Sequence, residues 1–217
     1  ASLSLATRLN GLVGFLLLAL IIGAAGGLSI NAYHKQSLDR IYLQHAVSAE
    51  EIQRIQGLLG DSRTQLLLAM QHSPDSPFAG LHDHPTTTHT DTATRNLTQV
   101  EKLWSGYQSR PHPGLEEPER SFDSARRQLI NEGLQPVRDL LLAVRFRDAN
   151  ELLLARINPL HAEARKHAET LIEAHRTQAM TLYGQTETTS AFTRNAVFVS
   201  IALVLVIALL LSRTIVR

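Results

Sequence analysis

Two long uncharged apolar stretches, one near each end of the 217-residue sequence, restrict its fold more than any other feature. Residues 9–33 contain no Asp, Glu, Lys or Arg, and neither do residues 195–212. A helix of about 20 apolar residues crosses the roughly 30 Å hydrocarbon core of a bilayer at 1.5 Å per residue. We therefore expect transmembrane helices at 9–31 and 195–212, and one domain outside the cytoplasm at 32–194.

A cleaved signal peptide is the alternative interpretation of the first stretch. The small residues of the segment Gly23-Ala-Ala-Gly-Gly27 are of the kind that signal peptidase accepts. However, a signal core has only about 7–15 apolar residues, and this run is longer. A helical pattern also continues from the run into the next segment, which favours a retained anchor.

Charged residues are distributed unevenly between the ends and the middle. Arg8, Arg213 and Arg217 are the only charges outside the two spans, and the positive-inside rule places them in the cytoplasm, in a stub at 1–8 and a segment at 213–217. Of the 21 Lys and Arg the other 18 lie between the spans with all 20 Asp and Glu, a net charge of −2. This middle segment lacks the basic surface that nucleic-acid binding needs.

The absence of cysteine excludes a disulfide framework and a cysteine-type metal site. The sequence begins at Ala1 without methionine and stops soon after the second apolar stretch. We therefore expect a longer protein whose output module lies beyond Arg217.

Apolar residues at helical spacing predict four helices between the spans. The first runs from about Asn31 to His72 and carries a heptad seam. Loops rich in Pro, Gly, Ser and Asp at 73–85 and 111–114 separate it from a second, shorter helix and a third from about Glu116, which Pro136 should kink. The fourth follows the break at 145–148. The seam of the first helix consists of Ile52, Ile55, Leu59, Ser62, Leu66 and Ala69.

This pattern predicts an all-α protein, an antiparallel up-down-up-down four-helix bundle whose first and fourth helices continue into the two transmembrane helices. The second helix presents Leu97, Val100, Trp104 and Tyr107 on one face. We interpret Trp104 and Tyr107 as core residues rather than an aromatic ligand cage.

No catalytic motif is present, so we do not expect an enzyme: the sequence has no glycine-rich phosphate loop, no serine elbow and no His-Glu-x-x-His. Arg63 is the most informative polar residue, because it lies beside the seam position Ser62 in an otherwise apolar turn. A planar guanidinium there suits a ligand carboxylate. The alternative is that Arg63 reaches water, or pairs with Asp61 or with a carboxylate of a neighbouring helix.

Histidines are dense after the first helix. His72, His82, His84 and His89, with Asp83 and Asp91, fall within about twenty residues. Such a set could bind a divalent metal or titrate near neutral pH, but His-x-His in a proline-bracketed loop is a weak motif. We therefore predict a solvated polar loop, no cofactor, and at most a weak metal candidate. Polar seam residues at His45, Ser48 and His167 are interpreted as setting helix register.

The sequence resembles the periplasmic sensor region of methyl-accepting chemotaxis receptors that have a Tar-homology four-helix-bundle ligand domain. The resemblance covers essentially the whole chain. It is carried by segments whose order and spacing match: Ser62–His72, Leu81–Pro85, Glu132–Pro136, Arg147–Asn150 and Asn158–His161.

The resemblance implies a homodimer in the bacterial inner membrane, with a ligand site at the periplasmic dimer interface. Arg63 aligns with the arginine that grips the ligand carboxylate in that family. The implied contacts also include Gln71 and His72 on the first helix and Asn150 at the start of the fourth. The family further implies a piston-like helix shift, a HAMP linker beginning at 213–217, and a cytoplasmic kinase and adaptor.

The sequence departs from the amino-acid receptors of that family. Leu68 and His72 replace two further arginines that hold amino-acid ligands, and the segment Ala149-Asn-Glu-Leu-Leu-Leu154 is mostly apolar. These differences favour an aliphatic or aromatic carboxylate over an amino acid, with delivery by a periplasmic binding protein left open. Alternative functions are the input module of a sensor histidine kinase or cyclase receptor, and a ligand-free dimerisation or partner-docking membrane protein.

Overall fold

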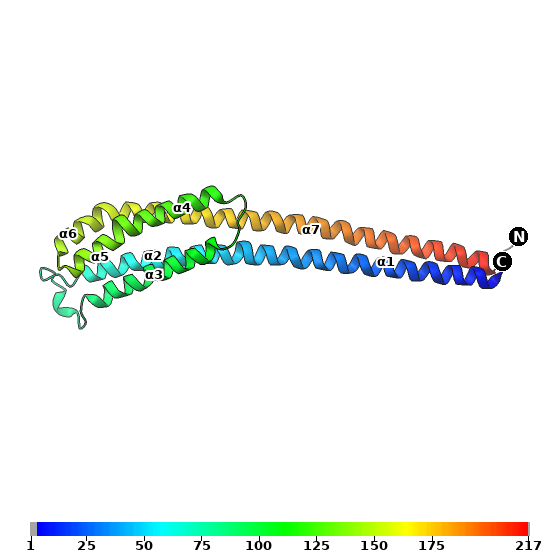
Figure 1. Ribbon diagram of the computed structural model, residues 1–217, viewed down its shortest axis with the longest axis horizontal. Helices are drawn as coiled ribbons and strands as arrows, with labels where there is room; N and C mark the ends of the chain where they lie inside the picture. The colour runs from blue at the N-terminus through cyan, green and yellow to red at the C-terminus, as the bar shows by residue number, and fades with distance from the viewer. Residues whose placement is uncertain (1–3, 217) are drawn as a thin grey trace. The chain divides into compact units, whose positions relative to one another are not determined.

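The computed structural model describes residues 4–216, and this part of the chain is helical with no strand (Figure 1). It divides into two compact units, which are described separately. Unit 1 contains Ala1–Ile41 and Met180–Arg217, and unit 2 contains Tyr42–Ala179.

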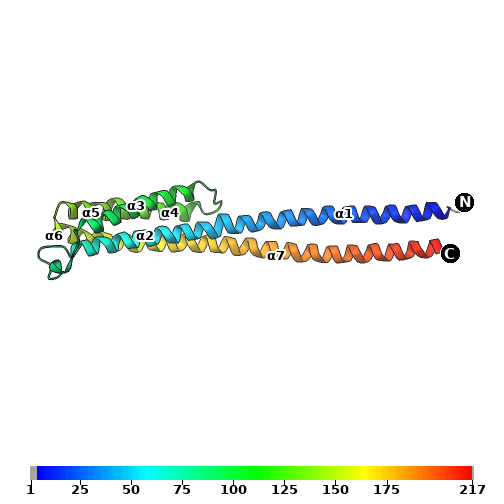
Figure 2. The ribbon, with the colours of Figure 1, turned by 90° about the horizontal axis from the view of Figure 1, so that it is seen from below.

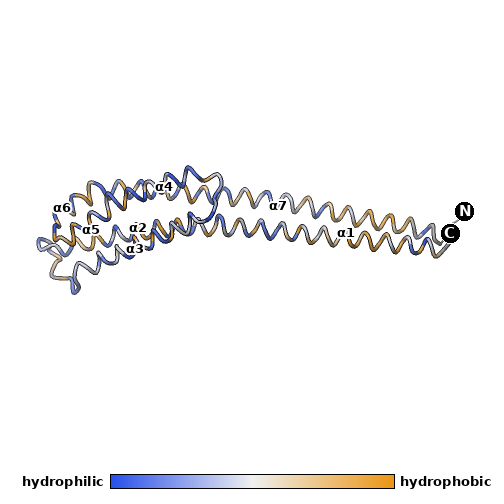
Figure 3. The backbone as a smooth tube through the Cα atoms, viewed as in Figure 1, coloured by the Kyte–Doolittle hydropathy of each residue, from blue (hydrophilic) through white to orange (hydrophobic). Residues whose placement is uncertain are grey.

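Unit 1 consists of α1 (Leu5–Asp39) and the C-terminal part of α7 (Asn158–Val216), which lie side by side (Figure 2). Both helices are long and apolar enough to cross a membrane, judged by length and composition (Figure 3). Their large apolar side chains are exposed in the isolated chain, as with Leu20 at 69% and Leu209 at 66%. Small residues of the two helices face a shared groove, as is common between membrane helices.

Unit 2 is the four-helix bundle that the sequence predicted (Figures 1 and 2). Its helices in chain order are α2 (Val47–Met70), which follows the π-helical turn η1 (Arg40–Ala46); α3 (Thr87–Gln108); α4 (Glu116–Leu129) with α5 (Gln135–Leu142); and α6 (Phe146–Leu152) leading into α7. The connectors at 71–86 and 143–145 lie at one end of unit 2, here called the connector end. The connector at 109–115 lies at the other end.

The heptad seam of α2 forms one wall of the core, as predicted. Every one of its six positions is buried, and Ser48 extends the buried row by one turn. On α3, Trp104 and Tyr107 are buried too, which confirms them as core residues. The apolar spacing of 3.6 residues therefore identified the inward faces of α2 and α3.

Two prolines inside long helices are each preceded by a five-residue π-helical turn. Pro136 follows η3 (Ile130–Leu134), and Pro159 follows η4 (Leu153–Ile157). Proline lacks a backbone N–H and its ring crowds the preceding turn, and a wider π turn relieves both problems. The irregularity therefore lies one turn before Pro136 rather than at the proline itself.

The two π turns pack closely because residue 133 is glycine. A Cβ atom on Gly133 would lie 3.1 Å from Ile157 Cγ1, tighter than ordinary van der Waals contact. The glycine therefore permits the close approach of η3 and η4, which fixes where α7 begins.

Val144 ends α5 in a strained conformation. Its φ is 59°, although it is β-branched. The N–H of Val144 bonds to Leu141 O at 3.0 Å and that of Arg145 to Leu140 O at 2.8 Å, the pattern of a Schellman motif, whose left-handed position usually holds glycine.

Val144→Gly should therefore stabilise unit 2 by about 1 kcal/mol, because the left-handed conformation costs a Cβ-bearing residue about 1–2 kcal/mol. Little packing is lost, since Val144 is 68% exposed. Urea unfolding of the full chain, followed by the emission of Trp104, measures this, because Trp104 is the single tryptophan and is buried in unit 2. A lower midpoint for the variant would contradict the assignment of strain.

Candidate functional site

Arg63 lies half-buried on α2 and reaches the start of α7. Its Nε and Nη2 atoms both donate to Asn158 Oδ1, at 3.1 and 2.8 Å. The seam residue Ser62 faces the core, so its neighbour Arg63 lies at the flank of α2, where α7 begins. A neutral amide, not a carboxylate, therefore holds the guanidinium.

Arg63 has a neutral hydrogen-bond partner, whereas the neighbouring Arg165 pairs with Glu169 at 3.5 Å. Burial lowers the pKa of His161, and the charges of Arg63 and Arg165 lower it further. Asp61, the partner considered from the sequence, instead accepts hydrogen bonds from Gln65 and Asn96 at 3.3 and 2.7 Å. Among the residues that the structure describes, Arg63 forms no ion pair, so this is an electropositive site suited to an anion.

The other predicted ligand contacts do not meet Arg63 within one chain. Gln71 is exposed at the C-terminal end of α2, about 12 Å along the helix axis from Arg63. Asn150 is exposed on α6, and His72 contacts other histidines instead. No contact in the described part of the chain links Arg63 to these three residues, so their role in one site stays a prediction.

Sequence reasoning missed two residues beside Arg63. Asn158 orients the guanidinium, and His161 lies against α2, where a Cβ on Gly60 would be 3.6 Å from His161 Nε2. The segment Asn158–His161 carried part of the family resemblance, so its position in the pattern was the available signal. Its contact with Arg63 required the register of α7 against α2, which spacing along the chain does not give.

The histidines after α2 form a cluster at the connector end instead of a solvated loop. One imidazole nitrogen from each of His72, His82, His84 and His89 lies within 4.8 Å of the others. His89 is only 8% exposed, and the other three are half-buried. These four side chains are less solvated than expected, because His89 is in the first turn of α3 and the ring of His84 lies against it, with 2.9 Å between the two Nε2 atoms. Asp91 is exposed and outside the cluster.

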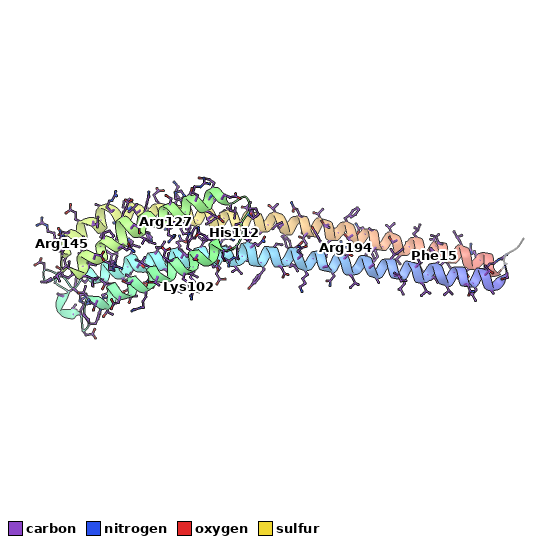
Figure 4. The ribbon with its side chains drawn as sticks, viewed as in Figure 1. Phe15, Lys102, His112, Arg127, Arg145 and Arg194 are labelled. Atoms are coloured by element: carbon purple, nitrogen blue, oxygen red, sulfur yellow. The ribbon has the colours of Figure 1, made fainter. Side chains whose placement is uncertain are left out.

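A buried polar network occupies the opposite end of unit 2, where Figure 4 labels His112. Tyr107 OH and His112 Nδ1 both donate to Glu119 Oε1, at 2.8 and 2.9 Å. His175 Nε2 then donates to the Tyr107 oxygen at 2.9 Å, and His175 Nδ1 accepts from His45 Nδ1 at 3.3 Å. Ser48 completes the network by donating to His112 Nε2 at 3.0 Å.

The network explains the polar seam residues His45 and Ser48. They hydrogen-bond to partners on α7 and in the 109–115 connector, which supports the prediction that they set helix register. His167 differs, because it is half-buried and lies 3.7 Å from Glu163 on its own helix.

The network should make unit 2 acid-sensitive. Burial lowers the pKa of His175 to about 3, and burial also lowers the pKa values of His45 and His112. Unfolded histidine titrates near 6.5, so the unfolded chain takes up protons first as pH falls. Stability is therefore complete above pH 6.5 and declines toward pH 3.

Lowering the pH from 7 to 5 should cost about 2 kcal/mol of unfolding free energy through His175 alone, at 1.36 kcal/mol per pH unit below 6.5. Urea unfolding followed by the Trp104 emission maximum measures the loss. His175→Gln should reduce this pH dependence while also lowering stability at pH 7. Equal slopes in both proteins would contradict the role given to His175.

These features define a class of protein: a helical bundle with two apolar helices, and with an arginine on α2 that forms no ion pair among the described residues. A model of the family described as Tar ligand binding domain homologue matches residues 1–179. No curated protein and no solved structure gives a significant match. The chain belongs to this family of chemoreceptor ligand-binding domains, a family of non-enzymatic sensory receptors.

Proposed function

We propose that unit 2 binds a small organic carboxylate at Arg63 and that the chain is the sensory region of a chemotaxis receptor. The observation that carries this proposal is the pairing of Arg63 with a single neutral oxygen. Nε and Nη2 converge on one Oδ1 of Asn158, whereas a carboxylate offers two oxygens to the same pair of donors. Exchanging the amide for a carboxylate would also neutralise the charge.

Residue types on α2 and before α7 favour an apolar substituent on the ligand over an amino acid. Leu154, which precedes the start of α7, is 58% exposed, and Leu68 on α2 is half-buried. No second and third arginine accompany Arg63 at positions 68 and 72, where leucine and histidine stand. An aliphatic or aromatic acid would bury apolar surface there while Arg63 holds its carboxylate.

Family membership suggests a dimer, and a dimer explains why one chain leaves the predicted contacts apart. In this proposal Gln71 and His72 of one subunit approach the Arg63 site of the other, with Asn150 at its edge. The bundle at 32–194 lies in the periplasm, and segments 9–31 and 195–212 cross the inner membrane. The stub at 1–8 and the start of a HAMP linker at 213–217 are cytoplasmic.

Signal transmission would use α7, which extends from Asn158 to Val216 as one helix. Asn158 is both the first residue of this helix and the hydrogen-bond partner of Arg63. A ligand that replaces Asn158 on Arg63 would release the start of α7 and favour another axial position. A bias of about 1–3 kcal/mol is sufficient for useful coupling to a cytoplasmic kinase through its adaptor.

Calorimetric titration of the full chain in lipid nanodiscs tests the proposed ligand class. We expect saturable binding of short aliphatic or aromatic carboxylates, and weak or no binding of the corresponding amides, which lack the charge. Strong binding of aspartate or serine, with none of these acids bound, would refute the proposal.

A further inference from the structure

The four-histidine cluster lies apart from Arg63 within one chain and shares only His72 with the carboxylate site proposed above. Three segments supply it: His72 just after α2, His82 and His84 in the connector, and His89 in the first turn of α3. The rings are in direct contact, with centroids 4.0 Å apart for His72 and His82 and 4.9 Å apart for His84 and His89. Side chains from three different segments of the chain thus lie next to one another.

Hydrogen bonds on the outer side of the cluster fix two of the imidazole tautomers. Asp83 Oδ1 lies 2.9 Å from His84 Nδ1, and an aspartate carboxylate can only accept a hydrogen bond. Gln65 Oε1 lies 2.9 Å from His89 Nδ1, and the amide orientation is set because Gln65 Nε2 donates to Asp61. Both Nδ1 atoms therefore carry the proton.

The Nε2 atoms of His84 and His89 therefore carry no proton and face each other as hydrogen-bond acceptors. His84 Nε2 and His89 Nε2 are 2.9 Å apart, and in neutral rings protonated at Nδ1 both carry lone pairs. Two lone pairs at this distance repel each other unless a cation lies between or beside them. His72 Nε2 is also buried, and it has no hydrogen-bond partner in the described part of the chain.

A metal ion binds a histidine through the lone pair of one ring nitrogen. Each of the four histidines offers one such nitrogen, and these four atoms lie within 4.8 Å of one another.

We propose that His72, His82, His84 and His89 form a binding site for one divalent transition-metal ion of the Zn²⁺, Ni²⁺ or Cu²⁺ class. Imidazole nitrogen suits these ions, whereas Mg²⁺ and Ca²⁺ require oxygen ligands. Ligand nitrogens around tetrahedral Zn²⁺ are about 3.3 Å apart, given bonds of about 2.0–2.1 Å. The four nitrogens already lie within 4.8 Å of one another, so small side-chain movements complete the site.

Asp83 and Gln65 would act as positioning residues in this site. A metal-binding histidine usually donates its other N–H to a carboxylate or carbonyl, which fixes the ring and raises its basicity. Asp83 does this for His84 and Gln65 does it for His89. The bound ion would hold the connector at 71–86 against the C-terminal end of α2 and the N-terminal end of α3.

Calorimetric titration of the full chain in nanodiscs with ZnSO4 tests the proposal, with MgCl2 as the negative control. We expect one Zn²⁺ per chain, no Mg²⁺, and at least about 100-fold weaker Zn²⁺ binding in His84→Ala and in His89→Ala. Asp83→Asn should weaken binding about 10–100-fold, because it removes only the outer partner of His84. Co²⁺ should give the intense visible absorption of a tetrahedral centre, which a loose surface complex does not produce.

His167→Ala is the matched control, because His167 is a half-buried histidine outside the cluster, and it should bind Zn²⁺ like the natural protein. The thermal transition of Trp104 emission shows whether each variant is folded. Arg63→Ala should also leave Zn²⁺ binding unchanged, which separates this site from the carboxylate site. Absence of Zn²⁺ binding, or equal binding by His84→Ala, His89→Ala and the natural protein, would overturn the proposal.

Discussion

Replacing Arg63 by alanine should weaken binding of the organic carboxylate about 30- to 150-fold. Hydrogen bonds to a charged group contribute about 1.5–3 kcal/mol, and a loss of 2–3 kcal/mol corresponds to this factor. Arg63→Lys should weaken carboxylate binding only about tenfold, because an ammonium keeps the charge but not the paired N–H donors. Calorimetry on the full chain in nanodiscs measures both.

Arg54→Ala is the matched control for this prediction. Arg54 is an exposed arginine on α2, so its removal changes net charge equally without altering the site. We expect its carboxylate affinity to match that of the natural protein. An Arg63→Ala variant that is folded by Trp104 emission and binds the acid with unchanged affinity would show that the anion lies elsewhere.

The double variant Glu101→Gln with Asp123→Asn should destabilise unit 2 by about 3–5 kcal/mol. Arg126 is only 1% exposed, and its guanidinium bonds to Glu101 at 2.5 Å and Asp123 at 2.8 Å while lying 5.3 Å from the Trp104 ring centroid. Neutralising both carboxylates leaves a buried cation without counter-charge, which costs far more than an exposed pair contributes. Urea unfolding followed by Trp104 emission measures the difference.

An exposed ion pair on the same helix provides the comparison. Arg120 and Glu117 lie 2.8 Å apart with both side chains 74% exposed, so Glu117→Gln should change stability by less than about 1 kcal/mol. If Glu117→Gln and the double variant lost similar amounts of unfolding free energy, burial would not be the reason that the Arg126 ion pairs matter for stability.

The sequence predicted the bundle well because its information is local. Heptad spacing placed all six seam residues of α2 in the core, and proline- and glycine-rich segments marked the connectors. The turns η3 and η4 were not foreseen, because a proline predicts a disrupted helix but not which kind of turn accommodates it. The close approach of Gly133 to Ile157 was not foreseen either, because spacing within one helix carries no information about a contact between helices.

The candidate sites were predictable only in part. Arg63 stood out because a charged residue interrupts an apolar turn, but its partner Asn158 is 95 positions away in sequence. His72, His82, His84 and His89 were recognised as a set, yet their convergence depends on the fold of the connector and on Gln65 orienting His89. His175 drew no attention, because one histidine on the buried face of a long helix is ordinary until Tyr107 is found beside it.

The proposed mechanism requires that carboxylate binding moves α7 relative to α2. The chain has no cysteine, so Gln53→Cys on α2 and Arg176→Cys on α7 can be spin-labelled without background. Both residues are exposed and line the same surface groove of unit 2. In the full chain in nanodiscs, a saturating organic acid should change the distance between the two labels by about 1–2 Å, the size of known signalling helix shifts, and should not do so in the Arg63→Ala background. An unchanged distance in a protein that calorimetry shows to be fully bound would contradict the claim.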